Sequence, residues 1–181
     1  MRNFFLIIGL LFATVVCGQD RPIKNKGIET DLLAWRIGKF PESFCIGGWY
    51  GYKGLKNSLI VGHFNLVKNH LPDGFASDKS TVLNLRSEYF FNKKYKHFYL
   101  GPSLLFEHAT MKSEKGYNQK LNYFMAGVST GFLFNIKDLI YFGPSLVAHF
   151  PLGNHKYVFA PGDDMPLPWS LEPGLKIGVT F

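Results

Sequence analysis

Three polar residues in the second half of the chain are of the types that nucleophilic catalysis requires. Ser145 carries a hydroxyl, His149 follows it four positions later as a candidate general base, and Glu107 offers a carboxylate. Such a set could attack an ester, for instance an acyl chain of a membrane lipid. Spacing alone does not bring the three groups within hydrogen-bond distance, so we treat them as weak catalytic candidates.

Side chains that bind metals are few and dispersed. His97 and His108 fall at a predicted turn and at a strand end, respectively. Asp163 and Asp164 lie in a segment rich in Gly and Pro, which is the ordinary composition of a solvated connection. A calcium site at these aspartates is a remote alternative. We expect neither a metal ion nor a cofactor.

The N-terminus has the pattern of an export signal. Arg2 precedes an apolar stretch at 4–16, and small residues around Gly18 suit a cleavage site. An apolar stretch of this length is short for a membrane-spanning helix. We therefore expect residues 1–18 to be a cleaved signal peptide and residues 19–181 to form one domain.

The two cysteines cannot form a disulfide within the mature chain, because Cys17 lies in the signal and only Cys45 remains. We expect Cys45 to be a small apolar side chain on a strand rather than a nucleophile, since no basic or His residue lies near it in the sequence. Lipidation of Cys17 is a minor alternative, because a lipid-acceptor cysteine normally follows a small residue and Cys17 follows Val16.

The composition is rich in aromatic residues and basic. The chain has 18 Phe, 9 Tyr and 3 Trp, and after the signal no apolar run approaches the roughly 18 residues of a membrane-spanning helix. The net charge of +7 comes mainly from lysines predicted in turns and loops, which include Lys53, Lys56, Lys93, Lys94, Lys96, Lys112 and Lys115. In an exported chain these lysines suit anionic lipid head groups or lipopolysaccharide and not a nucleic acid.

The elements that would position the polar groups are strands, and the clearest is at the C-terminus. From Trp169 to Phe181 every odd position is apolar and every even position is polar or Gly. A strand directs successive side chains to opposite faces, so Glu172 and Lys176 share the polar face. A lysine in the middle of a bilayer costs about 2 to 4 kcal/mol, so this face must point into a lumen.

Comparable alternation recurs upstream. The further segments lie at about 28–38, 43–52, 58–67, 81–91, 98–109, 124–135 and 140–150. A bilayer offers no water to satisfy the edges of an open sheet. The pattern therefore predicts an all-β fold, an eight-stranded antiparallel up-and-down transmembrane β-barrel.

The same alternation predicts which polar side chains fill the lumen. They are Arg36, His63, Asn65, Asn84, Arg86, Glu88, Glu107, His149, Glu172 and Lys176. Both signs of charge are present, and an eight-stranded barrel is only wide enough for its own side chains. We expect a packed, mutually neutralising polar network without an open pore.

Connections of two lengths join the predicted strands. The long ones are 68–80, 110–121 and 151–168. Bacterial barrels have short periplasmic turns and long external loops, so a surface partner would bind through these three links. The last link mixes apolar and basic residues, which suits lipopolysaccharide, a partner protein or a small hydrophobic ligand, or else a loop that folds over the barrel mouth.

With these features the mature chain resembles the small outer-membrane barrels of the OmpX, OmpW and OmpA transmembrane types, in architecture rather than in individual residues. The ending Leu175, Ile177, Val179, Phe181 looks like the C-terminal signal by which the barrel assembly machinery recognises such proteins.

Two further resemblances are more local. Residues 72–75 (Pro-Asp-Gly-Phe) together with the same ending are similar to an uncharacterised family of exported barrels, which implies no activity. Residues 47–49 (Gly-Gly-Trp) are similar to the first strand of lipocalins, but here they lie on the second strand and the predicted lumen is polar.

The expected function follows from the resemblance and the lumen together. We expect a protein of a Gram-negative outer membrane with a structural or surface-interaction role and no catalytic activity. One alternative is an OmpW-like conduit or binder for small hydrophobic molecules. Another is a lipid A modifying enzyme, an acyl hydrolase or acyltransferase, although the His-x-Ser motif of the deacylase type is matched at neither His63 nor His108.

Overall fold

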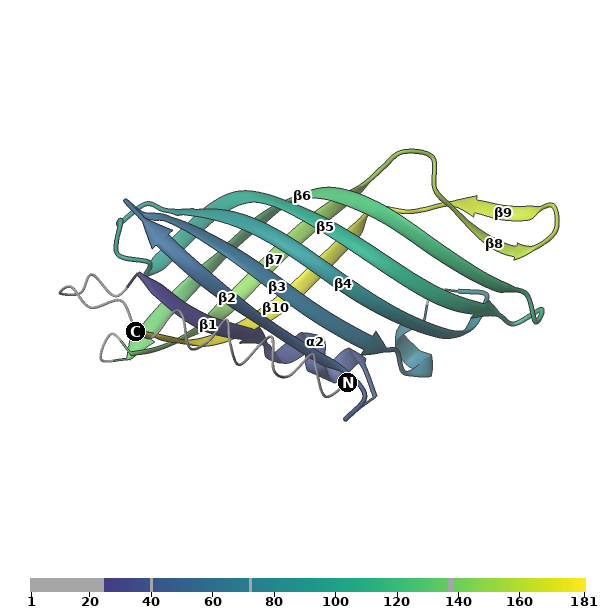
Figure 1. The fold of residues 1–181 in the computed structure, drawn as a ribbon, viewed down its shortest axis with the longest axis horizontal. Coiled ribbons are helices and arrows are strands. Elements are labelled where there is room, and N and C mark those ends of the chain that lie inside the picture. Colours follow the sequence, from purple (N-terminus) through teal and green to yellow (C-terminus); the bar gives the residue numbers. More distant parts are fainter. Residues whose placement is uncertain (1–24, 40, 72, 137–138) are drawn as a thin grey trace, which may run out of the picture.

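Eight antiparallel strands form a closed barrel (Figure 1). The computed structural model describes residues 25–39, 41–71, 73–136 and 139–181, and the predicted signal at 1–18 lies outside them. The barrel strands are β1 (Lys26–Asp31), β2 (Phe44–Tyr52), β3 (Leu55–Asn65), β4 (Phe75–Phe90), β5 (His97–Ser113), β6 (Asn118–Ile136), β7 (Ile140–Leu152) and β10 (Ser170–Thr180). Each pairs with its neighbour along the barrel, and β1 pairs with β10 to close the sheet, so the predicted fold class is confirmed.

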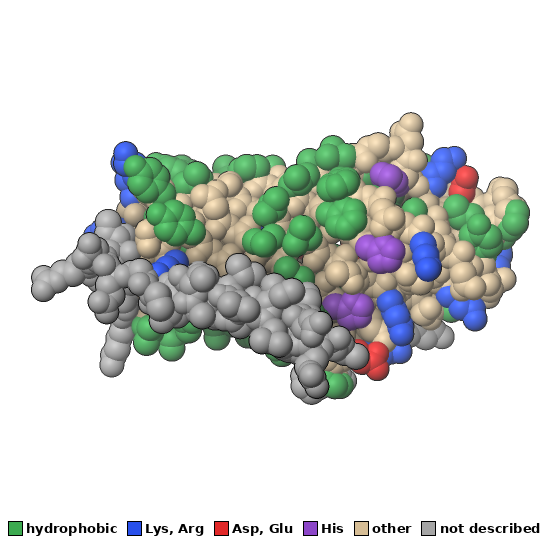
Figure 2. Space-filling view, viewed as in Figure 1, with side chains coloured by type: hydrophobic (Ala, Val, Ile, Leu, Met, Phe, Trp, Pro, Cys, Tyr) green, Lys and Arg blue, Asp and Glu red, His purple; other side chains and the backbone are tan. Residues whose placement is uncertain are grey.

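The outer face of the barrel is apolar over most of its height. Large hydrophobic side chains stand exposed on every second position, such as Leu100 and Leu104 on β5 and Val128 on β6. They form the band of hydrophobic side chains in Figure 2, which gives way to Lys and His toward one end. This arrangement is the reverse of a water-soluble protein and matches the surface of a barrel in lipid. Among the described residues, no helix is long and apolar enough to cross a membrane.

The two ends of the barrel differ. At the end where the C-terminus lies, on the left of Figure 1, short turns join β2 to β3, β4 to β5 and β6 to β7. Lys53 and Gly54 form the first of them with φ of 49° and 88°, the left-handed pair that a two-residue hairpin requires. We call this the turn end. The opposite loop end carries a 3₁₀ turn η1 (Lys68–His70) and an extra hairpin of β8 (Lys156–Ala160) and β9 (Asp163–Pro166).

The predicted long links are shorter than expected. Most of 110–121 is strand, because β5 runs to Ser113 and β6 begins at Asn118. The link 68–80 ends at Phe75, where β4 starts, and 151–168 contains the β8–β9 hairpin. Beyond the apolar band both faces of a strand are polar, so the alternation disappears from the sequence while the backbone ladder continues.

The predicted first strand, 28–38, was wrong in its second half. The strand β1 ends at Asp31, and a helix α2 (Leu32–Ile37) follows. The Asp31 Oδ1 atom accepts hydrogen bonds from the N–H groups of Leu33 (3.0 Å) and Ala34 (3.4 Å), which caps the helix. Arg36, expected on a strand with its side chain in the lumen, therefore belongs to this helix, and its side chain lies outside what the structure describes.

The helix α2 occupies a place in the barrel wall where β1 has stopped, with β10 on one side and β2 on the other (Figure 1). At this place, hydrogen bonds from side chains replace the backbone hydrogen bonds that a strand would form. Asp31 Oδ1 accepts from the Leu175 N–H of β10 at 3.0 Å, and Trp35 Nε1 donates to the Cys45 carbonyl of β2 at 3.1 Å. Pro173 lies at the same edge of β10 and has no N–H to satisfy. The wall thus remains closed to lipid without a continuous strand.

Candidate functional site

The polar groups of the lumen form two clusters stacked along the barrel axis. The first, which we call the ion cluster, consists of Glu29, Lys56, Glu88 and Lys176. Lys56 Nζ forms an ion pair with Glu29 and lies 3.6 Å from Glu88 Oε2, and Lys176 Nζ pairs with Glu88 Oε1. All four residues are at most 3% exposed. Two positive and two negative charges thus alternate in a group of zero formal charge.

Neighbouring groups complete the ion cluster. The Tyr141 hydroxyl donates to Glu29 Oε2 at 2.9 Å, and the Ser129 hydroxyl donates to Glu88 Oε1 at 2.8 Å. The Lys56 ammonium lies 5.2 Å from the centre of the Tyr141 ring, and the Lys176 ammonium lies 4.6 Å from that of Tyr99. These contacts offset part of the desolvation of four buried charges, while Glu29 Oε1 and Glu88 Oε2 accept no hydrogen bond from the described residues.

Sequence reasoning missed half of this cluster. It placed Glu88 and Lys176 in the lumen, but it assigned Lys56 to a turn and omitted Glu29. Lys56 is instead the second residue of β3, with its side chain pointing inward and 1% exposed. The alternation along β3 could have revealed the inward position of Lys56, because this residue is separated by even numbers of positions from the inward residues Ser58 and Ile60.

The second cluster is centred on His149. Its Nε2 atom lies 3.0 Å from Ser103 Oγ, and its Nδ1 atom lies 3.0 Å from Glu172 Oε1. The Ser103 hydroxyl also donates to Asn84 Oδ1 at 2.8 Å. We call Asn84, Ser103, His149 and Glu172 the histidine cluster. It has the order of groups found in a Ser-His-acid triad.

The structure does not bring together the three candidates chosen from the sequence. His149 contacts Ser103 of β5 and not Ser145, whose hydroxyl has no hydrogen-bond partner among the described residues. Glu107 lies beside Tyr123 and Ser80 rather than bonded to the imidazole. The carboxylate that orients His149 is Glu172.

The histidine cluster has the atoms of a hydrolase but no space for a substrate. Ser103 is 4% exposed and His149 is fully buried. An acyl group would have to approach Ser103 Oγ within about 3 Å, together with donors for the developing oxyanion. The present geometry serves hydrogen bonding between β4, β5, β7 and β10.

An apolar plug closes the lumen toward the loop end. It consists of Phe75, Leu105, Ala109, Met111, Tyr123, Met125, Tyr157 and Leu167. Tyr157 comes from β8 and Leu167 follows β9, so the link 151–168 folds over the barrel mouth and buries part of its own apolar surface. Burial is also the main cause that raises the pKa of the Tyr157 hydroxyl above its ordinary value.

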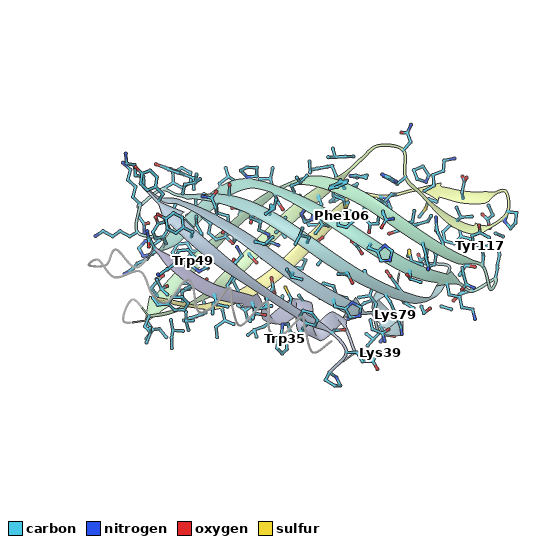
Figure 3. All side chains as sticks on the ribbon, viewed as in Figure 1. Trp35, Lys39, Trp49, Lys79, Phe106 and Tyr117 are labelled. Carbon is cyan, nitrogen blue, oxygen red and sulfur yellow. The ribbon has the colours of Figure 1, made fainter. Side chains whose placement is uncertain are left out.

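An aromatic cluster closes the other side of the ion cluster, toward the turn end. Its members are Trp49, Phe90, Tyr95, Tyr99, Leu133 and Tyr141. Trp49, labelled in Figure 3, lies inside the barrel near this end. A small cavity remains behind α2, and it is lined by Glu29, Thr30, Asp31, Cys45, Ile60, Arg86 and Lys176. Cys45 itself is buried on β2 and packs with Ile60 and Phe64.

His63 was wrongly expected in the lumen. On β3 the inward positions are even, so His63 faces outward, where its Nδ1 lies 3.0 Å from Thr81 Oγ1 and its ring centre lies 6.4 Å from that of Phe44. Asn65 shares this parity but is buried at the end of β3, where its side-chain amide donates to Glu42. Near the rim of the apolar band outward side chains are polar too, so polarity no longer distinguishes the two faces.

The dispersed histidines and aspartates have other partners. His97 stacks on Phe132 with ring centres 5.4 Å apart, and His108 Nδ1 lies 2.6 Å from Asn122 Oδ1. Asp163 and Asp164 form ion pairs with lysines at the loop end. No group of three or more side chains that could hold a metal ion occurs in the described part of the chain.

The chain is a closed eight-stranded antiparallel barrel with an apolar exterior and a charged, packed interior, and small outer-membrane β-barrels share this fold. Two solved structures are similar to the chain. Neisserial surface protein A (NspA) matches with a TM-score of 0.55 and 14% identity over 86% of this chain and 94% of that one. The N-terminal β-barrel domain of Pseudomonas aeruginosa OprF matches with a TM-score of 0.54 and 15% identity over 87% and 98%. At these identities the likeness concerns the fold alone. No family model and no curated protein matches the sequence.

Proposed function

We propose that the protein is an outer-membrane barrel of a Gram-negative bacterium, exported with residues 1–18 as a cleaved signal, with a structural or surface-interaction role and without conduction. The observation that carries this proposal is the filled lumen. From the turn end to the mouth, the aromatic cluster, the ion cluster, the histidine cluster and the apolar plug follow one another. A hydrated ion has no continuous path through such a sequence of packed groups.

The test has two measurements on the full-length protein. The first is cell fractionation, in which the barrel should appear in the outer membrane and migrate faster on a gel before boiling than after. The second is recording from a planar bilayer containing the purified barrel, in which no conductance steps should exceed those of the bare bilayer. A soluble periplasmic location would overturn the proposed membrane role, and reproducible steps would overturn the proposed absence of conduction.

The sequence of the mature protein tests the export step separately. Cleavage after Gly18 leaves Gln19 as the first residue, so the intact mass of the purified protein should be that of residues 19–181. A mass that includes the apolar stretch, or one increased by a lipid, would contradict the assigned signal.

A conduit for small hydrophobic molecules is the second candidate, and α2 favours it. The helix interrupts the hydrogen-bonded wall between β2 and β10, and the cavity behind it reaches Cys45 and Ile60. Vesicles containing the barrel should then take up a small apolar dye faster than empty vesicles. Trp35→Ala, which removes the bond from α2 to β2, should increase the rate further. Equal rates for all three would exclude this candidate.

A further inference from the structure

Thr110 lies at the centre of a group of basic side chains on the outer face of the barrel. It is directly opposite Lys79 of β4 on one side and directly opposite Lys120 of β6 on the other. The Cβ atoms of such cross-strand partners are about 5 Å apart. Both lysines are exposed.

The strand β5 adds two more side chains to the group. Lys112 and His108 are each two residues from Thr110, so they share its face at a distance of about 7 Å. Both are exposed. Lys79, His108, Thr110, Lys112 and Lys120, which we call the Thr110 cluster, thus form a cross with the threonine hydroxyl in the middle.

Among the described residues, no carboxylate neutralises the charge of the Thr110 cluster. None of its three lysines forms an ion pair with a described carboxylate. Asp78 of β4 and Glu107 of β5 belong to the inward-facing set, and the exposed Glu114, two residues after Lys112, forms no ion pair with the three lysines. By contrast, Lys115 and Lys156 pair with Asp163 and Asp164. Three uncompensated ammonium groups around one hydroxyl attract an anion.

The position of the cluster identifies the anion. Along β5, the outward residues from Phe98 to Phe106 are apolar, and the polar ones begin at His108. The Lys and His side chains in Figure 2 lie beyond the hydrophobic band, on the side of the loop end, and Figure 3 labels Lys79 in this region. If the loop end is external, as in bacterial barrels, the cluster lies at the level of the head groups of the outer leaflet.

We propose that the Thr110 cluster binds a phosphate group of a phosphorylated glycolipid in the outer leaflet. The ammonium groups of Lys79, Lys112 and Lys120 pair with the phosphate oxygens, and the Thr110 hydroxyl donates to one of them. The acyl chains of the same lipid lie against Leu104 and Phe106 of the apolar band below. This inference rests on the outer-membrane location proposed above, and it names the lipid partner of that location.

Native mass spectrometry of the detergent-solubilised barrel tests the site with bisphosphorylated lipid A, with the same lipid after removal of its phosphates, and with inorganic phosphate. We expect the bisphosphorylated lipid to bind at least about tenfold more tightly than the dephosphorylated one. The variant K79Q/K112Q/K120Q should lose this preference. The control K53Q/K93Q/K94Q removes the same charge from exposed lysines of the turn end and should keep it.

Several results would overturn the proposal. These are an unchanged preference in K79Q/K112Q/K120Q, an equal loss in the control, or binding of inorganic phosphate as tight as that of the lipid. Gel migration before boiling checks that each variant is folded. If the triple variant does not fold, the test uses the wild-type barrel at increasing salt concentration. Its preference for bisphosphorylated over dephosphorylated lipid A must then decrease, because salt screens the charges of the lysines. Conduction by the barrel would contradict the proposed function and leave this result intact.

Discussion

The carboxylate of Asp31 accepts a hydrogen bond of 3.0 Å from the backbone N–H of Leu175, across the seam where β1 meets β10. The same oxygen caps α2 through the N–H of Leu33. One side chain therefore satisfies the edge of the closing strand and starts the helix that continues the wall. Loss of this acceptor would leave backbone donors facing an apolar environment.

Replacement of Asp31 tests this double role. Asp31→Ala should lower the free energy of unfolding by about 2 to 4 kcal/mol, because it removes a helix cap and leaves the Leu175 N–H unsatisfied. Asp31→Asn keeps an oxygen acceptor and should cost less than about half as much. Urea unfolding of the barrel in lipid vesicles, followed by tryptophan fluorescence, measures both. Equal losses would mean that the charge, and not the hydrogen bonds, is what matters.

The ion cluster should be sensitive to the loss of one member. Lys56→Met leaves the buried Glu29 carboxylate without its ion-pair partner and should cost about 3 to 5 kcal/mol of unfolding free energy. The double variant E29Q/K56M should be more stable than K56M alone, since Glu88 keeps Lys176. In the same unfolding assay Lys115→Met, which breaks an exposed ion pair, should cost less than about 1 kcal/mol. A similar cost for both lysines would contradict the cluster.

The position of Lys56 illustrates what the sequence could provide and what it could not. The alternation of Trp169–Phe181 and of the segments upstream predicted the number of strands and the inward faces of β4, β5, β7 and β10, although not those of β1 and β3, because an apolar exterior and packed polar groups inside impose opposite residue types. Beside the tight turn at Lys53 and Gly54 this contrast is absent, and a lysine there is indistinguishable from a solvated one. Only the pairing of β1 with β2, and of β2 with β3, brings Glu29 next to it.

The histidine cluster should show no nucleophilic reactivity. Ser103 is buried beneath the apolar plug, so a fluorophosphonate probe, which labels activated serines, should not react with the folded barrel. The acyl chains of lipopolysaccharide incubated with the protein should remain unchanged by mass spectrometry. Labelling of wild-type protein that is lost in Ser103→Ala would restore the enzyme alternative.

The partner of His149 could not have been found by spacing. Ser103 is 46 positions away and Glu172 is 23. They meet because Ser103 of β5 and His149 of β7 lie opposite the same residue of β6, Gly127, and because β10 pairs with β7 on its other side. The sequence offered Ser145 because it is close along the same strand. Similarly, a six-residue helix such as α2 is too short to produce a helical period, so the segment 28–38 was indistinguishable from a strand.

The hairpin over the mouth should depend on its buried anchor. The Tyr157 ring packs against Phe75 with ring centres 5.2 Å apart, so Tyr157→Ala should detach the hairpin from the plug. Limited proteolysis between residues 153 and 168 should become several-fold faster, while the barrel itself stays protected. Met165→Ala, at an exposed position of the same hairpin, should leave the rate unchanged. Equal cleavage of both variants would show that the hairpin is not anchored through the ring.

The seam between β1 and β10 has a consequence for how the molecule is built. Its ladder comprises five residue pairs, from Gly27↔Thr180 to Asp31↔Lys176. Every other junction joins barrel strands that are next to one another in chain order, with the β8–β9 hairpin inserted between β7 and β10, so each forms between segments close in sequence, whereas this one must bring together the two extremes of the domain. Barrel completion is therefore a single long-range event at the end of a series of local ones, and its rate should limit the appearance of the mature protein.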